Sequence, residues 1–318
     1  MTFSWITPNS RIANLVFTDT AIRFIELKNG SSSEVTNYGE QELSPGVISE
    51  GKIIEVEMLE TILEQCLQKW KIMKRQVRFI VPDMFIIIRK LTVPKDVKND
   101  EIKGYLFLEI GTSIHLPFED PLFDVVLLGE TEQEKKILLV AAPEETVKSY
   151  QDLLEDSKLT PIVADISPLS IYRFFHSLNM TDAENHEMIL QFDTHLATIS
   201  IFHLHQPIFM RPLSLRNEQP LNIEKVDQEQ QLFVLEDTFK EIEKVMSFYR
   251  YTLNKGEARV NTVFLVGDHP HLPQIEQHLS KLLEVSIISK PDLPIMCQNE
   301  VLPLQYIVAV GLGLKEVQ

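Results

Sequence analysis

Two stretches that lie far apart in this chain share one pattern: an apolar strand, a short polar turn and a second strand. They are IANLVFTDTAIRFIEL at residues 12–27 and MILQFDTHLATISIFH at residues 188–203. Apolar runs rich in Ile, Val and Phe that are bounded by Thr and Asp are typical of hairpins. Because each hairpin begins one half of the chain, the pattern predicts two similar halves that face a cleft.

The first hairpin is followed by a third strand near residues 34–39 and by a helix. Leu59, Ile62, Leu63, Cys66 and Trp70 recur at spacings of three and four, which is typical of one buried helix face. A buried strand is predicted at residues 76–83. The sequence therefore predicts that the first half opens as a mixed α/β structure.

Residues 84–160 form a distinct block. We predict a long strand at 84–94, a helix at 98–113, a hairpin of 123–130 and 135–143, and a helix at 144–156. In the first of these helices we expect Asn99 or Asp100 as the cap, and Ile102, Leu106 and Phe107 facing inward. This order of elements predicts a small α+β module, after which the chain returns to the first half at residues 160–167.

The second half begins with the hairpin at 188–203 and a further strand at 206–215. A long helix is predicted from about Asp227, where Gln230 completes a capping box, and its apolar stripe runs to Tyr249. A strand and turn near 261–273 and one more helix follow. The second half is therefore also predicted to be α/β.

Charge and cysteine content exclude several classes of function. The 318 residues carry a net charge of −16, which argues against a nucleic-acid or anionic-membrane surface as the main binding partner. Cys66 and Cys297 are interpreted as reduced packing residues, because the N-terminal residues show no secretory signal. No run approaches the roughly 20 apolar residues of a membrane span, so we expect a cytoplasmic protein that reaches a membrane only through a partner.

Taken together, these segments resemble the PilM family of type IV pilus assembly proteins, within the superfamily of actin, Hsp70, sugar kinases and FtsA. The first hairpin lies where the family has its first phosphate hairpin. The other segments that carry the resemblance are VRFIVPDMFIIIRKLTVP (77–94), LEIGTSIHLPFEDPLFDVVLLGE (108–130), ILLVAAPEETVKSYQDLLEDSKLTPIVADISPLSIYR (137–173), Phe248-Tyr249-Arg250, Val266-Gly267 and AVGLGL (309–314). Each segment is a weak signal alone, and their order and spacing make the resemblance specific.

The resemblance implies a two-lobed actin-like α/β fold, built from duplicated ribonuclease H-like halves with an inserted α+β subdomain in the first half. It places residues 1–83 and 161–185 in the first actin-like subdomain, 84–160 in the inserted partner-binding subdomain and 186–318 in the second half.

The resemblance also implies a nucleotide site at three turns. The corresponding residues here are Thr18, Asp19, Thr20, Gln191, Asp193, Thr194, Gly267 and Asp268. Phosphate binding needs backbone N–H groups in tight turns, usually at glycine, and an acid that holds hydrated Mg²⁺. The family's magnesium-side Asp falls on Val16 and Gln191, its turn glycines fall on Thr18 and Asp193, and the third turn keeps only Gly267. We therefore predict a vestigial cleft.

Two of these turns also carry a carboxylate, at Asp19 and Asp193. Like charges ~4 Å apart at an effective dielectric of about 20 repel by about 4 kcal/mol, against roughly −8 kcal/mol for micromolar ATP binding. We therefore expect no cofactor and no enzymatic activity. The alternative is an active ATP-binding protein in which Asp193 holds Mg²⁺ and Gln191 orients the attacking water.

The family's partner is PilN, a membrane protein whose cytoplasmic N-terminal peptide docks in a groove at the inserted module. The positions that match this groove are Arg89, Leu91, Pro94, Glu109, Pro117 and Phe118. Peptide grooves need apolar pockets, backbone donors and a few polar clamps. Leu91 and Phe118 have an alternative role as core residues of the module.

The resemblance thus predicts a scaffold of type IV pilus, competence or secretion assembly, peripheral to the inner membrane. Its partners would be a PilN-type protein and a pilus motor ATPase or platform protein, with no nucleic acid. We expect no metal site, since His203 and His205 share one strand face without a Cys or acid at ligand spacing, and His269 and His271 flank Pro270 in a turn that is expected to be an exposed loop. A further alternative is an FtsA-like membrane-associated cytoskeletal protein, which is disfavoured because no amphipathic anchor follows AVGLGLK.

Overall fold

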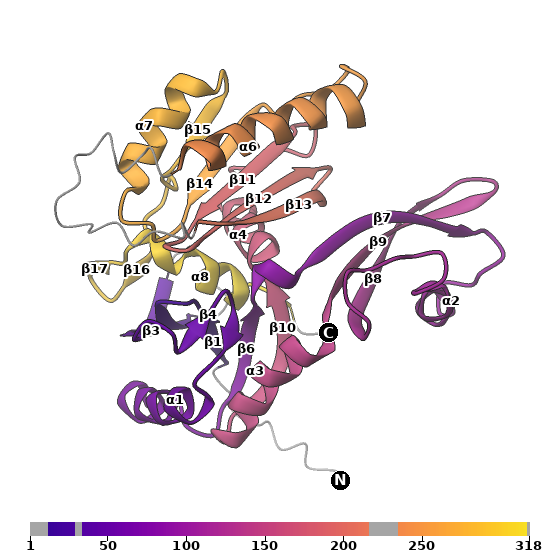
Figure 1. Ribbon diagram of the computed structural model, residues 1–318. Coiled ribbons are helices and arrows are strands. Elements are labelled where there is room, and N and C mark those ends of the chain that lie inside the picture. The colour runs from indigo at the N-terminus through magenta and orange to yellow at the C-terminus, as the bar shows by residue number, and fades with distance from the viewer. Residues whose placement is uncertain (1–11, 29–33, 216–234, 317–318) are drawn as a thin grey trace, which may run out of the picture. The chain divides into compact units, whose positions relative to one another are not determined.

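The computed structural model describes residues 12–28, 34–215 and 235–316, and Figure 1 shows its helices and strands. The contacts divide the chain into two compact units. Unit 1 consists of Met1–Pro82, Lys148–Leu178 and Asp292–Gln318, and unit 2 consists of Asp83–Val147 and Asn179–Pro291. The units group segments by contact alone, so the domain boundaries that follow from the family's architecture stay a prediction.

Unit 1 is built on a seven-stranded sheet in the order β10-β6-β1-β2-β3-β16-β17. Its strands are β1 (Ala13–Phe17), β2 (Ala21–Leu27), β3 (Glu34–Glu42), β6 (Gln76–Val81), β10 (Thr160–Ile166), β16 (Met296–Cys297) and β17 (Glu300–Val301). The short hairpin β4 (Ile48–Ser49) and β5 (Lys52–Ile53) stands apart from this sheet. The helices are α1 (Val56–Trp70), α3 (Glu144–Asp156, which starts just before unit 1), α4 (Ser167–Ser177), the 3-10 turn η4 (Leu304–Tyr306) and α8 (Ile307–Gly313).

The first predicted hairpin and helix are confirmed in unit 1. β1 pairs antiparallel with β2, and β6 lies parallel to β1 on the other side. In α1 the buried residues include Leu59, Leu63, Cys66 and Trp70, as the spacing predicted. The Trp70 ring lies on Gly39 of β3, where a Cβ would be 2.0 Å from Trp70 Nε1. The helix therefore packs on the sheet at a position that only glycine permits.

The 179–291 part of unit 2 is a five-stranded sheet in the order β13-β12-β11-β14-β15 with helices on one face. Its elements are β11 (Glu187–Phe192), β12 (Leu196–His203), β13 (Gln206–Ser214), α6 (Glu236–Ser247), the π-helix η3 (Phe248–Leu253), β14 (Thr262–Val266), α7 (Leu272–Leu282) and β15 (Ser286–Ile288). α6 and α7 place Ile242 and Ile275 in one core with Leu190 of β11, and Figure 1 shows these helices beside β14 and β15. The second predicted hairpin is confirmed. The capping box predicted at Asp227 and Gln230 lies outside the described residues.

The inserted module is a three-stranded sheet in the order β7-β9-β8, with one helix on it. Its elements are the 3-10 turn η1 (Asp83–Phe85), β7 (Ile87–Pro94), α2 (Ile102–Glu109), β8 (Pro121–Glu130) and β9 (Glu134–Pro143). α2 is shorter than predicted and begins after Glu101, without a side-chain cap from Asn99 or Asp100. Ile102 and Leu106 are buried as expected, but Phe107 is 69% exposed, so its predicted inward orientation is wrong.

Candidate functional site

The turn of the first hairpin is closed by its own threonines. Thr18 N donates to Ala21 O at 2.9 Å, and Thr18 Oγ1 accepts from the backbone N–H groups of Thr20 (3.3 Å) and Ala21 (3.0 Å). These hydrogen bonds take the place of the glycine conformation that a phosphate-binding turn uses. The N–H groups of Thr18, Thr20 and Ala21 are therefore used within the turn.

The carboxylate of Asp19, in the same turn, is bound by a second turn of unit 1. It accepts hydrogen bonds from the backbone N–H groups of Glu50 (2.7 Å) and Gly51 (2.9 Å). Both residues have positive φ, 52° and 76°, which turns their N–H groups to one side of the β4–β5 hairpin. This carboxylate is therefore held by backbone donors of its own unit but keeps its charge, so its predicted repulsion of phosphate stays a prediction.

Tyr150 of α3 completes this arrangement from below the turn. Its hydroxyl donates to Gly51 O at 3.0 Å, and its ring lies 5.4 Å from the ring of Phe17 at the end of β1. Burial, with a contribution from the nearby Asp19, raises the pKa of Tyr150, so the phenol stays a hydrogen-bond donor. No sequence pattern indicated this link, because its members come from three separate elements.

The turn of the second hairpin lies in unit 2 and binds its own carboxylate differently. Gln191 is buried, and its Nε2 donates to Asp193 Oδ2 at 2.6 Å. Asp193 N donates to Leu196 O at 2.8 Å, which closes the hairpin. Thr194 N donates to Asp268 Oδ1 at 3.2 Å. The N–H groups at this turn are thus also bound within the unit.

The third turn follows β14 and meets the second turn directly. Gly267 has a φ of 131°, and a Cβ on it would be 1.9 Å from Phe192 O. His269 N donates to the same Phe192 oxygen at 3.0 Å. Glycine is therefore required at 267 for the contact of two backbones, since no other residue fits this space.

The structure thus brings Gln191, Asp193, Thr194, Gly267 and Asp268 together in unit 2. Thr18, Asp19 and Thr20 form a separate group in unit 1. Within the described residues, no group of three or more His, Cys, Asp or Glu is placed to hold a metal ion.

Thr198 adds a contact that the sequence did not indicate. It lies opposite Gln191 on β12, and its Oγ1 donates to the buried Asp83 at 3.1 Å.

The residues predicted for a peptide groove all lie in the module, and of these Leu91 and Phe118 pack against the core under its helix. Arg89, Leu91 and Val93 lie two residues apart along β7, so they share one face of the strand, the face that α2 covers. Arg89 Nη1 donates to His115 O at 2.7 Å, which joins the strand to the segment that carries Pro117 and Phe118.

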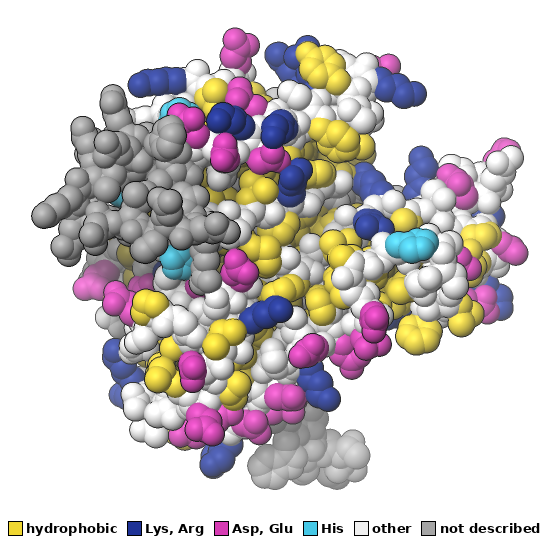
Figure 2. Space-filling model, viewed as in Figure 1, with side chains coloured by type: hydrophobic (Ala, Val, Ile, Leu, Met, Phe, Trp, Pro, Cys, Tyr) yellow, Lys and Arg dark blue, Asp and Glu magenta, His cyan; other side chains and the backbone are white. Residues whose placement is uncertain are grey.

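Within this set, Leu91 and Phe118 are partly buried and pack against the module core. Arg89 and Pro117 are exposed. Glu109 is the last residue of α2, and its carboxylate accepts a hydrogen bond from Ser113. Pro94 ends β7, and strand alternation places it on the opposite face. The set therefore combines apolar packing residues with exposed polar ones, and Figure 2 shows hydrophobic and charged side chains mixed over the visible surface of the molecule.

Comparison with known proteins decides the family. A family model described as type IV pilus assembly protein PilM matches residues 15–221, which is more than half of the chain. The chain belongs to the PilM family. No curated protein matches the sequence.

Solved structures agree with the predicted fold class. A PilM–PilN type IV pilus biogenesis complex is similar with a TM-score of 0.76 at 17% identity, covering 97% of this chain and 100% of that one. The ethanolamine utilization protein EutJ from Carboxydothermus hydrogenoformans is similar with a TM-score of 0.54 at 9% identity, covering 97% and 90%. The actin-like α/β fold class is therefore confirmed for this PilM-family chain. None of its described helices has the length and apolar character needed to cross a membrane.

A pair of stacked histidines in this PilM-family chain was not foreseen. His203 was expected on one strand face with His205, but its ring stacks on His186 with centroids 4.0 Å apart. His186 Nδ1 lies 2.6 Å from the hydroxyl of Tyr249 in the π-helix. Burial, and then the charge of His203, lower the pKa of His186, which favours the neutral form of this ring in the stack.

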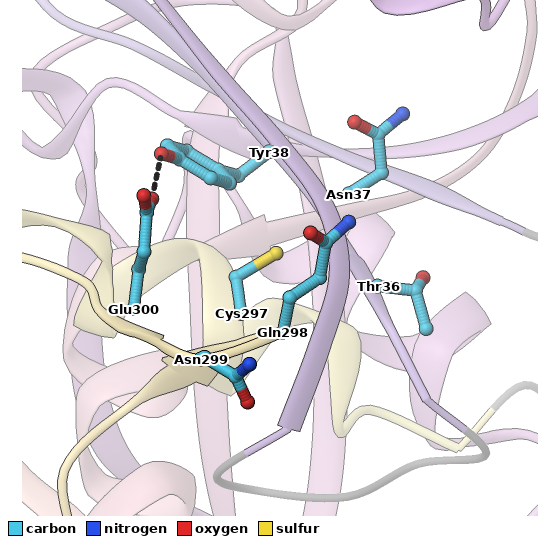
Figure 3. Close-up of a pocket in the computed structure, with 7 residues that line it drawn as sticks. All are labelled: Thr36, Asn37, Tyr38, Cys297, Gln298, Asn299 and Glu300. Atoms are coloured by element: carbon cyan, nitrogen blue, oxygen red, sulfur yellow. Dashed lines mark hydrogen bonds between the residues drawn. The ribbon is translucent and has the colours of Figure 1, made fainter.

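A pocket of about 280 Å³ opens at one edge of the unit 1 sheet. It is lined by Thr36, Asn37, Tyr38, Cys297, Gln298, Asn299 and Glu300. Figure 3 shows Tyr38 and Glu300 joined by a hydrogen bond on one side, and the carboxamides of Asn37 and Gln298 toward the other. Burial, and then the charge of Glu300, raise the pKa of Cys297, so this thiol is a poor nucleophile. Nothing in the family resemblance pointed to this pocket.

Proposed function

We propose that this PilM-family protein is a scaffold of type IV pilus assembly that does not hydrolyse ATP. On this proposal it binds the cytoplasmic N-terminal peptide of a PilN-type inner-membrane protein and so sits at the cytoplasmic face of that membrane. Its further contacts would be to a pilus motor ATPase or platform protein.

The proposal is supported mainly by one observation: the backbone N–H groups of the predicted phosphate turns already donate hydrogen bonds to other groups of the protein. The N–H groups of Thr20 and Thr194, which a phosphate would need, donate to oxygens of Thr18 and Asp268. Gly267, the glycine kept in the third turn, is packed against Phe192 O. A ligand phosphate would have to displace these bonds, and each buried group left unpaired costs about 1–3 kcal/mol.

Two observations support the partner. The similar solved structure is a complex of PilM with PilN, and it covers nearly all of this chain. The module offers exposed Arg89 and Pro117 beside the partly buried Phe118, and this mixture suits an extended peptide with apolar anchors.

Peptide binding tests the partner. A fluorescent peptide copied from the N-terminus of a PilN-type protein is titrated with the parent protein and with the Arg89→Glu, Phe118→Asp double variant. We expect binding at least about tenfold weaker, because a clamp and an anchor are lost together. Because Phe118 also packs in the core, an Arg89→Glu, Pro117→Glu variant repeats the test with exposed residues only.

A matched control changes the opposite face of the same sheet. Lys90→Glu with Leu122→Asp makes the same kinds of substitution at an exposed lysine and at a leucine that is 49% exposed. We expect this variant to bind like the parent. Equal binding by the two groove variants and the parent would overturn the proposed groove.

Thermal unfolding tests the nucleotide part. We expect 1 mM Mg-ATP to leave the melting temperature unchanged, since a ligand stabilises only in proportion to its binding to the folded state. A rise of several degrees that is lost in Asp193→Asn would establish the alternative, in which Asp193 holds Mg²⁺. Peptide binding would then still test the scaffold role separately.

A further inference from the structure

The pocket at the sheet edge of unit 1 is the part of the molecule that the proposed function does not use. β3 supplies one wall, and the β16–β17 hairpin supplies the other through its tip residues Gln298 and Asn299. Gln298 holds a φ of 55° at the tip, which a side chain other than glycine seldom adopts. The hairpin is therefore held in a strained turn beside the cavity.

The charged side chain that lines the pocket, Glu300, is a hydrogen-bond acceptor. Asn37 Nδ2 donates to Trp70 O at 2.9 Å, which turns this side chain toward α1, whereas strand alternation places Tyr38 on the other face of β3. The Tyr38 hydroxyl donates to Glu300 Oε2 at 3.3 Å, so the phenol oxygen keeps its lone pairs. Glu300 adds a carboxylate, and no lysine or arginine lines the pocket. This set suits a ligand with several donors and a positive charge.

We propose that the pocket binds a guanidinium group, presented by an arginine side chain of a protein partner. A guanidinium carries five N–H donors in one plane, so it can bond a carboxylate and further acceptors at once, whereas an ammonium offers three donors from a single point. The volume of about 280 Å³ lies just below the range of pockets for drug-sized ligands and fits one long side chain. The net charge of −16 attracts such a cation.

The place of the pocket in the sheet favours a protein as the source. β17 is the last strand in the order, so one of its edges has no neighbouring strand in the described sheet. Val301 of β17 is 65% exposed beside Glu300. An extended partner segment can approach such an edge while one of its side chains enters the pocket.

Tyr38 provides a spectroscopic signal for occupancy. The carboxylate of Glu300, then burial, raise the pKa of the phenol, because a negative charge disfavours a second one beside it. A guanidinium between the two groups would offset this effect. Ligand binding is therefore expected to lower the pKa of Tyr38, seen as tyrosinate absorbance at lower pH.

The test compares a charged ligand with its neutral isostere. The probes are the peptide acetyl-Val-Thr-Arg-Thr-Val-amide, the same peptide with citrulline in place of arginine, and acetyl-arginine-amide, each titrated by calorimetry. We expect the arginine peptide to bind about tenfold more tightly than the citrulline peptide. Equal binding of these two peptides, or no binding of either, would overturn the proposal.

Two variants locate the binding. Glu300→Gln should weaken binding of the arginine peptide about tenfold and abolish the shift of the Tyr38 pKa. Glu64→Gln, which removes the same charge from an exposed position on α1 of the same unit, should bind like the parent. Equal binding by parent and Glu300→Gln would place the ligand elsewhere and overturn the site.

Acetyl-arginine-amide tests whether the bound guanidinium belongs to a protein or to a small molecule. If acetyl-arginine-amide binds as tightly as the peptide, the pocket serves a free guanidinium compound and the protein partner is wrong. Tighter binding of the peptide supports a protein partner. The pocket and the proposed module groove share no residue, so failure of either leaves the other standing.

Discussion

The two hairpins that open the halves of this chain look alike in sequence, but their turns play opposite roles in hydrogen bonding. One turn supplies the acceptor and the other supplies a donor. In the first, the carboxylate of Asp19 accepts hydrogen bonds from the N–H groups of Glu50 and Gly51. In the second, the turn is the donor, and Thr194 gives its N–H to the carboxylate of Asp268. A turn without the glycine of a phosphate loop is thus completed by a neighbouring turn of its own unit. In both hairpins the polar groups of the turn are therefore bonded within their own unit.

Substitution of Gly267 should have the largest effect on stability, because its contact with Phe192 has no counterpart in the first hairpin. Gly267→Ala places a Cβ 1.9 Å from Phe192 O at a φ of 131°. We expect the free energy of unfolding to fall by about 3 kcal/mol or more. Urea unfolding followed by circular dichroism measures the loss.

Gly256→Ala is the matched control for that variant, since its φ is 87° but nothing lies within 4 Å of the added Cβ. It should lose only about 1–2 kcal/mol, the cost of the left-handed backbone. Equal losses in the two variants would show that the contact with Phe192 is unimportant.

Asp19 tests the first hairpin directly. Asp19→Ala leaves the N–H groups of Glu50 and Gly51 without their acceptor, and hydrogen bonds to a charged group contribute about 1.5–3 kcal/mol. We expect a loss of about 2 kcal/mol by urea unfolding. Asp193→Ala, which removes a carboxylate bonded to the side chain of Gln191, should lose less. The opposite order would reverse the assignment of the two turns.

A pH dependence should distinguish the turn after β14 from the first hairpin. The pKa of His269 is lowered to about 4, first by burial and next by His271, while Asp268 opposes the shift and His195 adds to it. Between pH 6.5 and 4 the unfolded chain binds a proton that the folded chain resists, so stability is full above pH 6.5 and falls toward pH 4.

Because the His269 ring is partly exposed, solvent screening reduces this effect to the order of 1 kcal/mol between pH 7 and pH 5. Urea unfolding at the two pH values measures it. His269→Gln should lose part of the slope, whereas an unchanged slope would assign the pH dependence to other groups.

Asp268→Ala is expected to have the smallest effect. It removes the acceptor of Thr194 N, a hydrogen bond of 3.2 Å in a partly exposed turn. We expect a loss of about 1 kcal/mol or less by urea unfolding. A loss larger than that of Asp19→Ala would show that the second turn depends on its borrowed carboxylate more than the first depends on its donors.

Much of the fold could be predicted from local patterns. The apolar runs at 13–17 and 187–192 are bounded by Thr and Asp, and both form strands of the predicted hairpins. The prediction for α2 was wrong in detail, because the run from Tyr105 to Leu108 is apolar on every side and gives no single face. Phe107 was therefore assigned to the core, although it lies at the surface.

For the candidate site, the sequence predicted which residues lie at the turns but not which groups they bind. The family resemblance placed Asp193 and Asp268 at the right turns, but no spacing rule predicts that Asp268 would bind Thr194 or that Asp19 would bind a turn at residues 50–51. These links join residues far apart in the chain, and side-chain partners of that kind follow from tertiary packing. The pocket beside Tyr38 was missed for the same reason, since β3 and β16 meet only in the folded sheet.

The last helix of unit 1 carries a consequence for how the chain is made. α8 meets α4 where Gly311 would bring a Cβ 1.8 Å from Ser170 O, and its end carbonyls at Gly311 and Gly313 accept from Arg173 and Arg78. During synthesis, β1 leaves the ribosome before α8, and all of 179–291 is translated between them. The sheet of unit 1 is therefore completed late, and until then Arg78 and Arg173 lack these carbonyl partners.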